Sequence, residues 1–74
     1  MSATSATLGI RLNDRPHSVA EGATLMELLR EVGLAERRGV AVAVNGEVVA
    51  RAAWETRGLA QGDRVLVIRA TQGG

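Results

Sequence analysis

One short segment of the sequence, and no other, has the periodicity of an amphipathic helix. Its start is marked by Thr24 and Glu27, which have the spacing of a capping box. The apolar residues of one face recur every three or four positions, at Leu25, Leu28, Leu29 and Val32. Gly33 follows as a residue that can adopt positive φ beyond a helix end. Because a helix of about two turns is unstable in water by itself, it must pack on the rest of the chain.

The rest of the chain has the pattern of strands separated by turns. The first strand alternates through Leu8, Ile10 and Leu12, which is the period of a strand with one buried face. Further strands are expected at residues 16–19, 40–44, 47–50 and 64–69. Asn45-Gly46 is a strong signal for a two-residue hairpin. Pro16 has no amide hydrogen to donate, so its strand is expected at a sheet edge.

This order of elements predicts a two-layer α+β domain. One helix can cover one face of one sheet, and the first and last strands can pair in parallel only through a right-handed crossover. The predicted fold is therefore a β-grasp (ubiquitin-like) fold, in which a mixed sheet of four to five strands packs on one short helix. We assign residues 8–70 to this domain, residues 1–7 to a flexible N-terminal tail and residues 71–74 to an extended C-terminal tail.

The last expected strand is apolar on both faces. Val65 and Val67 point one way, and Leu66 and Ile68 point the other way. A strand buried on both sides has this pattern, but a single short helix covers only one face. We therefore expect an exposed apolar patch near the C-terminal tail, of the kind that marks partner surfaces. The alternative is a few scattered surface aliphatic residues, which are ordinary in soluble proteins.

Size and composition argue against several classes of function. A chain of 74 residues has a thin core and no room for an enclosed catalytic cavity. Nine basic and eight acidic residues give a net charge of +1, which is not the footprint of a nucleic-acid-binding protein. Cysteine is absent, so disulfides and thiolate metal sites are excluded. No apolar run is long enough to cross a membrane and no signal peptide is recognisable, so we expect a cytoplasmic protein.

The side chains offer little chemistry of their own. His17 is the one histidine, is expected on the surface, and cannot form a metal site with scattered carboxylates alone. Trp54 is the one aromatic residue. Tryptophan is common at binding hot spots, but in a thin aliphatic core we interpret this one as a packing residue. An enzyme is therefore the least expected class of function.

The C-terminal Gly73-Gly74 pair is the feature with the most chemical meaning. Glycine has no Cβ, so its backbone can enter a narrow channel that excludes other residues. A free carboxylate is a poor acyl donor, but its mixed anhydride with AMP has a good leaving group, and sulfide then gives a thiocarboxylate. Terminal glycines also occur as frayed ends. At the end of a β-grasp pattern, directly after the last strand, the pair is a much stronger indication.

Several segments together resemble the ThiS family of sulfur carriers. They are, in chain order, residues 21–25, the Leu28-Leu29 pair, residues 45–49 with Arg51 and Trp54, residues 59–65, and the Ala-Thr-Gln-Gly-Gly end at 70–74. The resemblance covers about residues 8–74, which is essentially the whole folded chain. The joint pattern is specific, although each segment alone is not.

The resemblance implies a carrier protein of thiamine thiazole biosynthesis and not an enzyme. A ThiF-like adenylyltransferase would use ATP and magnesium to adenylate the carboxylate of Gly74. A sulfurtransferase system would convert this acyl-adenylate to the thiocarboxylate. A ThiG-like thiazole synthase would then accept the sulfur. The carrier itself would bind no cofactor and no metal.

By the motif match, each site residue has an implied role. Gly74 would be the covalent carrier site. The tail residues in the partner's channel would be Thr71, Gln72 and Gly73. The partner docking patch would be the outer side of the last strand, at Leu66 and Ile68.

Three other interpretations stay open. The small subunit of molybdopterin synthase also ends in Gly-Gly and carries a thiocarboxylate, although Gln72 and the Arg51 to Trp54 loop favour ThiS over it; carriers of other sulfur pathways belong to the same alternative. A ubiquitin-like protein modifier would join Gly74 to a target lysine. This chain has no lysine, which excludes lysine-linked chains of the protein but not single conjugation. The last interpretation is a plain binding module with an inert tail.

Overall fold

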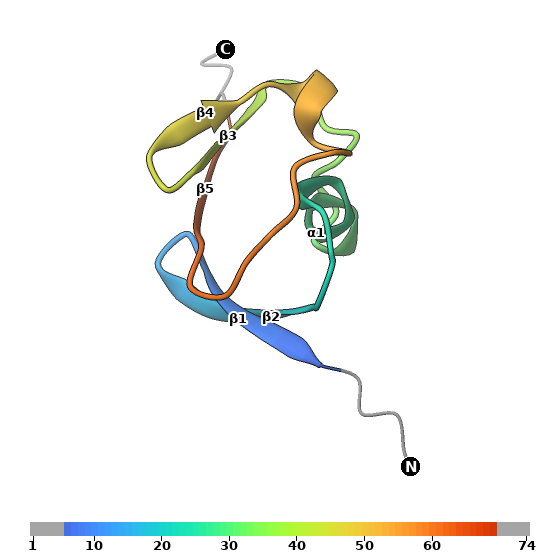
Figure 1. The fold of residues 1–74 in the computed structure, drawn as a ribbon. Coiled ribbons are helices and arrows are strands. Elements are labelled where there is room, and N and C mark those ends of the chain that lie inside the picture. The colour runs from blue at the N-terminus through green and yellow to red at the C-terminus, as the bar shows by residue number, and fades with distance from the viewer. Residues whose placement is uncertain (1–5, 70–74) are drawn as a thin grey trace.

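The computed structural model describes residues 6–69, which form a five-stranded sheet and one α-helix. The strands are β1 (Thr7–Leu12), β2 (Arg15–Ala20), β3 (Val40–Val44), β4 (Glu47–Val49) and β5 (Arg64–Arg69). The helices are α1 (Leu25–Glu31) and the 3₁₀-helix η1 (Arg51–Ala53). The sheet order is β2-β1-β5-β3-β4, with β5 central and parallel to β1 (Figure 1). This confirms the predicted α+β β-grasp fold with a mixed sheet on one short helix.

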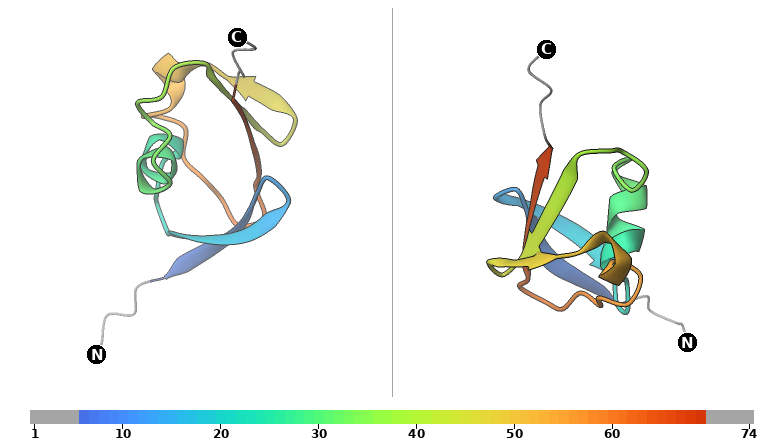
Figure 2. Two further views of the ribbon diagram at one scale, coloured as in Figure 1. Left: turned by 180° about the vertical axis from the view of Figure 1, so that it is seen from behind. Right: turned by 90° about the horizontal axis from the view of Figure 1, so that it is seen from above.

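Helix α1 lies against one face of the curled sheet, and the core fills the space between them (Figure 2). The helix contributes Leu25, Leu28 and Leu29, each at most 1% exposed, as the periodicity predicted. The sheet contributes its inward-facing side chains, which are Ile10, Val19, Val42, Val44, Val65 and Val67. Each fully buried side chain of this size stabilises the fold by about 1.5–3 kcal/mol relative to exposure.

The start of α1 is the predicted capping box. The hydroxyl of Thr24 accepts from the Glu27 N–H at 3.2 Å, and Oε1 of Glu27 accepts from the Thr24 N–H at 2.9 Å. Past the helix end, Gly33 has a φ of +79°, as expected for a residue that terminates a helix. Among the described residues, no helix is long and apolar enough to cross a membrane.

Both hairpins use two-residue turns with positive φ at each central residue. The φ angles are 51° and 67° at Asn13 and Asp14, and 54° and 84° at Asn45 and Gly46. These are type I′ turns, whose twist matches the twist of the paired strands. The turn at Asn45-Gly46 was predicted as a hairpin, and it sets the register of β3 against β4.

β3 and β5 span the predicted residues, whereas the other three strands differ from prediction by one residue at an end. β1 begins at Thr7, so this residue belongs to the domain and not to the N-terminal tail assigned to residues 1–7. The reason is that the Ala6 carbonyl accepts from the Glu21 N–H at 3.0 Å and continues the hairpin ladder. β2 is the edge strand that Pro16 required, and it is one residue longer at each end than expected. β4 ends one residue early, where the chain turns into η1.

Trp54 is a packing residue, as predicted. Its side chain is 1% exposed, and Nε1 donates to the Val49 carbonyl at 3.0 Å. The Arg51 guanidinium lies 4.5 Å from the centroid of the Trp54 ring. That guanidinium also donates to the carbonyl oxygens of Ala35 and Arg37, at 2.6 and 2.7 Å. These contacts tie η1 to the loop that precedes β3.

Candidate functional site

The face of the sheet opposite α1 carries exposed aliphatic side chains. Leu66 and Ile68 of β5 are 47% and 54% exposed, so an apolar patch is present on the last strand, as expected. Val48 of β4 is 75% exposed, and Ala41 and Ala43 of β3 lie between these strands. We call these five residues the apolar patch. Its role in docking stays a prediction.

Val48 is a member of this patch that the sequence analysis did not identify. The ladder pairs Val48 with Ala43, and Ala43 with Leu66, so the three side chains form one row across three strands. The signal was present in the sequence. A two-residue turn at Asn45-Gly46 fixes the register, and the period of two then places Val48 on one face and Val49 on the other.

β5 is held on its β1 side by the turn residue Asn13. The backbone pairing of β1 with β5 is only two residue pairs long. The Asn13 N–H donates to the Val65 carbonyl at 2.9 Å, and its side-chain Oδ1 accepts from the Val67 N–H at 2.7 Å. One asparagine side chain thus extends the parallel ladder. It fixes the strand that leads toward the C-terminal tail.

The start of β5 is held by Asn45 and Asp63. Nδ2 of Asn45 donates to Oδ1 of Asp63 at 3.0 Å, and Oδ1 of Asn45 accepts from the Arg64 N–H at 2.9 Å. Asp63 is 8% exposed, and its second oxygen accepts from the Ala60 N–H at 2.8 Å. Both carboxylate oxygens therefore have partners, and this buried acid stabilises the turn that leads into β5.

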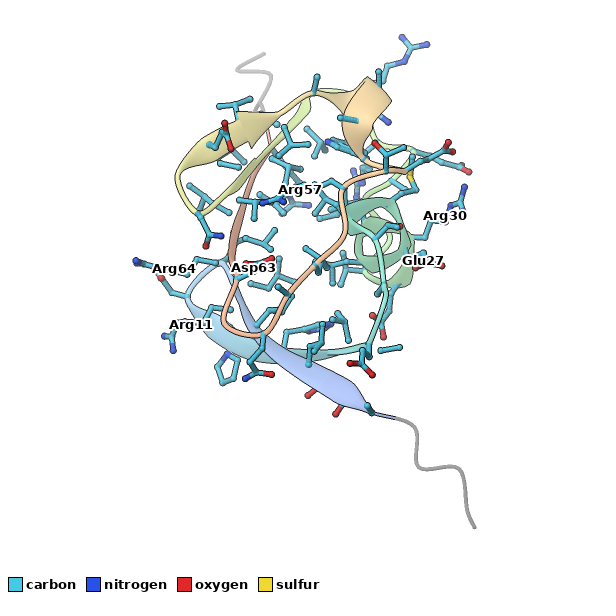
Figure 3. All side chains as sticks on the ribbon, viewed as in Figure 1. Arg11, Glu27, Arg30, Arg57, Asp63 and Arg64 are labelled. Carbon is cyan, nitrogen blue, oxygen red and sulfur yellow. The ribbon has the colours of Figure 1, made fainter. Side chains whose placement is uncertain are left out.

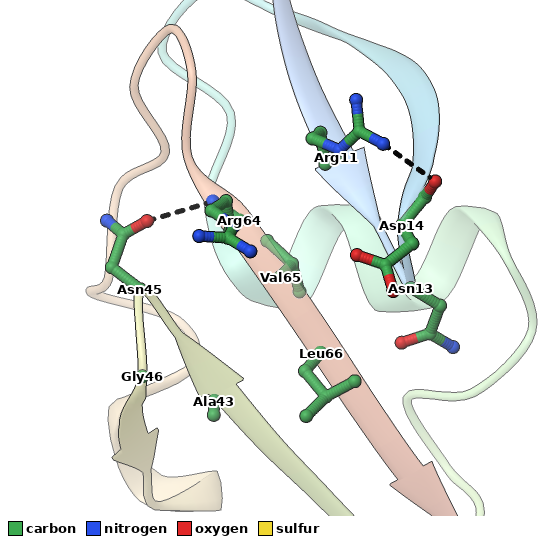
Figure 4. A pocket seen from close by; sticks show the side chains of 9 residues that line it. All are labelled: Arg11, Asn13, Asp14, Ala43, Asn45, Gly46, Arg64, Val65 and Leu66. Atoms are coloured by element: carbon green, nitrogen blue, oxygen red, sulfur yellow. Dashed lines mark hydrogen bonds between the residues drawn. The ribbon is translucent and has the colours of Figure 1, made fainter.

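A groove of about 520 Å³ lies at the start of β5, between the two hairpin turns (Figure 4). Arg11 and Arg64 line it from neighbouring parallel strands, on which they are register partners. Both project on the side of the sheet away from α1, whereas Glu27 and Arg30 lie on the helix side (Figure 3). Leu66 also lines the groove and joins it to the apolar patch.

The described residues bring few reactive groups together. Within residues 6–69, no group of three His, Asp or Glu side chains is placed to hold a metal ion. His17, which was expected on the surface, is partly exposed, and its Nε2 lies 3.5 Å from Oε1 of Glu31. What this part of the chain presents on its outer face is the apolar patch and the hydrogen-bonded turns that hold β5.

The predicted covalent site and tail fall outside the described residues. This applies to Thr71, Gln72, Gly73 and Gly74. The last described residue is Arg69, which ends β5, so the tail follows almost directly from the central strand of the sheet. Leu66 and Ile68 lie on that same strand, close to the start of the tail.

Comparisons with known proteins point in one direction. The model of the ThiS family matches residues 10–74, a range that includes the C-terminal tail. The chain is similar to a crystal structure of the thiamine biosynthesis protein ThiS from Geobacter metallireducens, with 32% identity, a TM-score of 0.77, and coverage of 90% of this chain and 100% of that one. An NMR solution structure of a thiamine biosynthesis protein from the same organism has 32% identity and a TM-score of 0.73, with coverage of 90% and 88%. A search of curated proteins finds no match.

Proposed function

Since the chain belongs to the ThiS family, we propose that this small sulfur carrier holds its sulfur as a thiocarboxylate on Gly74 and delivers it to a thiazole synthase of thiamine biosynthesis. The observation that carries this proposal is the family match over residues 10–74, because it includes the Gly73-Gly74 end that the chemistry requires. The proposed location is the cytoplasm, where ATP and soluble biosynthetic enzymes are found. The chain acts as a co-substrate of its partner enzymes.

The proposed chemistry occurs at the Gly74 carboxylate in two steps. A carboxylate oxygen attacks the α-phosphorus of ATP in the active site of a ThiF-like adenylyltransferase, and pyrophosphate leaves. A sulfide sulfur delivered by a sulfurtransferase system then attacks the acyl carbon, and AMP leaves, which gives the thiocarboxylate. Magnesium belongs to the adenylyltransferase, where it neutralises the phosphate charges.

The tail and the body of the carrier have separate roles in this proposal. Gly73 has no side chain and gives the partner access to the terminal carbonyl, with Thr71 and Gln72 in the same channel. Residues 70–74 can span at most about 17 Å when fully extended. The partner must therefore hold the body close to the end of β5.

The docking patch proposed for this purpose is Leu66 and Ile68. Both are about half exposed, and they lie on the strand that leads into the tail. Burial of aliphatic surface of this kind contributes about 25 cal/mol per Å² of apolar area. Val48 extends the same surface across the sheet.

Intact-mass measurement tests the proposal. The chain is incubated with ATP, magnesium, a ThiF-like adenylyltransferase and a sulfur source. The expected result is a mass gain that corresponds to replacement of one oxygen by one sulfur. A variant that lacks Gly74 should show no gain, whereas Arg30→Gln, a change at an exposed residue of α1 on the helix side of the sheet, should gain mass like the unaltered chain. If enzymes that modify a control carrier leave this chain unchanged, the proposed chemistry is wrong for that partner.

The destination of the sulfur is tested with the thiocarboxylated chain. A ThiG-like synthase should convert the thiocarboxylate back to the carboxylate, whereas the large subunit of molybdopterin synthase should not. If the chain loses its sulfur faster to the molybdopterin synthase subunit than to the ThiG-like synthase, the molybdopterin alternative is favoured. A ladder of conjugates on a denaturing gel would instead support the protein-modifier alternative.

A further inference from the structure

Two arginines stand side by side on the outer face of the sheet. Arg11 and Arg64 are register partners on neighbouring strands, whose spacing is about 4.8 Å. Like charges directly opposite each other in a sheet are destabilising. Among residues 6–69 the one contact at ion-pair distance joins His17 to Glu31, between β2 and α1. The described part of the fold therefore does not compensate this repulsion, which points to a role in binding.

Most of the hydrogen-bond donors of the two guanidinium groups are unused within residues 6–69. Nη2 of Arg11 donates to the Asp14 carbonyl at 3.0 Å, and no described residue accepts from the Arg64 guanidinium. The Asp14 carboxylate also lines the groove but is not at ion-pair distance from either arginine (Figure 4). A guanidinium presents five donors in a planar fork that fits carboxylate and phosphate oxygens. The groove thus offers two such forks for an external anion.

The arginine pair is continuous with the apolar patch. On the same face of β5, Arg64 is followed by Leu66 and then by Ile68, which is about 13 Å from Arg64 along the strand. Apolar contacts are non-directional, whereas charged contacts fix the register of an interface. A tail can enter a narrow channel of the partner only if the folded domain is held in one orientation relative to that partner. A charged end placed far from the tail supplies a second point of attachment that sets this orientation.

We propose that Arg11 and Arg64 form the orienting end of the docking surface, and that the adenylyltransferase covers them with paired acidic side chains. Its apolar residues cover Leu66 and Ile68 at the other end. This inference rests on the proposed function, because it names the surface chemistry of the proposed partner. The carboxylates enter the groove at the start of β5, and their charge steers the encounter before the apolar contacts form.

Association kinetics with a purified ThiF-like adenylyltransferase test this proposal, measured by stopped flow at low and at high salt. The variant R11Q/R64Q should associate about tenfold more slowly at low salt and lose most of its salt dependence. The matched control R37Q/R38Q removes the same charge from the exposed loop before β3, which lies at the opposite end of β5 from the groove, and should keep the rate and the salt dependence of the unaltered chain. Leu66→Ser should speed dissociation without a change in salt dependence.

A conservative variant separates charge from geometry. R11K/R64K keeps two point charges but not the planar forks, so it should keep the salt dependence and dissociate faster. Thermal unfolding of R11Q/R64Q should occur at or above the temperature of the unaltered chain, because a cross-strand repulsion has been removed. Equal association rates for R11Q/R64Q and R37Q/R38Q would overturn the proposal.

Three further outcomes are distinguishable. Binding of inorganic pyrophosphate or ATP to the free carrier, detected at the Arg11 and Arg64 side-chain NMR signals, would assign the groove to phosphate and overturn the acidic-partner proposal. The mass gain at Gly74 is measured in the samples that contain the adenylyltransferase. If the unaltered chain is adenylated and R11Q/R64Q is adenylated equally well at low partner concentration, the inference fails while the proposed function stands. If the unaltered chain neither binds nor is modified, both fail.

Discussion

Asn13 provides the sharpest test of how β5 is fixed. Its backbone has positive φ, and its Oδ1 accepts from the Val67 N–H at 2.7 Å. Asn13→Gly keeps the turn, because glycine tolerates positive φ, and removes only the side-chain acceptor. Val67 is 8% exposed, so its amide is left without a partner in a nearly buried position. We expect a loss of about 1–2 kcal/mol in the free energy of unfolding.

Urea unfolding followed by tryptophan fluorescence measures this loss, because Trp54 is the one tryptophan and is buried. For a domain of this size, 1 kcal/mol corresponds to a shift of about 4–8 °C in the unfolding temperature. Hydrogen exchange adds a local measurement. The Val67 amide should exchange roughly tenfold faster for each 1.4 kcal/mol lost.

The matched control is Asn13→Asp, which keeps an oxygen acceptor and tolerates positive φ. It should lie within about 0.5 kcal/mol of the unaltered chain. If Asn13→Gly unfolds at the same urea concentration as Asn13→Asp, and Val67 exchanges no faster, the side-chain hydrogen bond contributes nothing. The idea that Asn13 fixes β5 would then be wrong.

Three more predictions concern the turns, the loops and the outer face. Arg51→Lys loses the planar fork that reaches two carbonyls and lies over Trp54, and should cost about 1–2 kcal/mol in urea unfolding. Gly46→Ala places a Cβ at a φ of 84° and should cost about 1–2 kcal/mol, whereas Gly58→Ala, with open space at its Cβ and no such φ, should be nearly neutral; equal thermal shifts would contradict this. Leu66 is exposed, so the unfolding free energy of Leu66→Ser should stay within about 0.5 kcal/mol of that of the unaltered chain. Adenylation of this variant at low partner concentration should be slower. Slowing that persists at saturating partner would point to an effect on chemistry and not on docking.

The parts of the fold that follow from local rules were predictable from the sequence. The capping box at Thr24 and Glu27 placed the helix, and Asn45-Gly46 placed the second hairpin. Each of these signals needs only neighbouring residues. The apolar outer face of β5 was also predictable, because one helix cannot cover two faces of a sheet.

The parts that depend on contacts between distant segments were not predictable in the same way. The adjacency of Arg11 and Arg64 depends on the parallel register of β1 and β5, which is set across more than fifty residues. The hydrogen bond from Val67 to Asn13 spans 54 residues, and the one from Arg64 to Asn45 spans 19. Asn45 was correctly predicted as a turn residue. The side-chain oxygens of Asn13 and Asn45 also accept hydrogen bonds from backbone amides of β5, and this becomes apparent only once the strands are placed.

The central position of β5 explains how so small a chain can combine a buried core with an exposed apolar face on one strand. Val65 and Val67 face α1 and are at most 8% exposed, while Leu66 and Ile68 face outward. Because alternate residues lie on opposite faces, substitutions at Leu66 and Ile68 change the apolar patch with little effect on the core. A strand at an edge would be paired on one side only along its whole length. β5 instead pairs with β3 from Val65 to Arg69, and the Asn13 side chain extends its hydrogen bonding on the β1 side as far as Val67. Under the proposed function, a partner that binds the outer face therefore binds a strand that is fixed on both sides over most of its length.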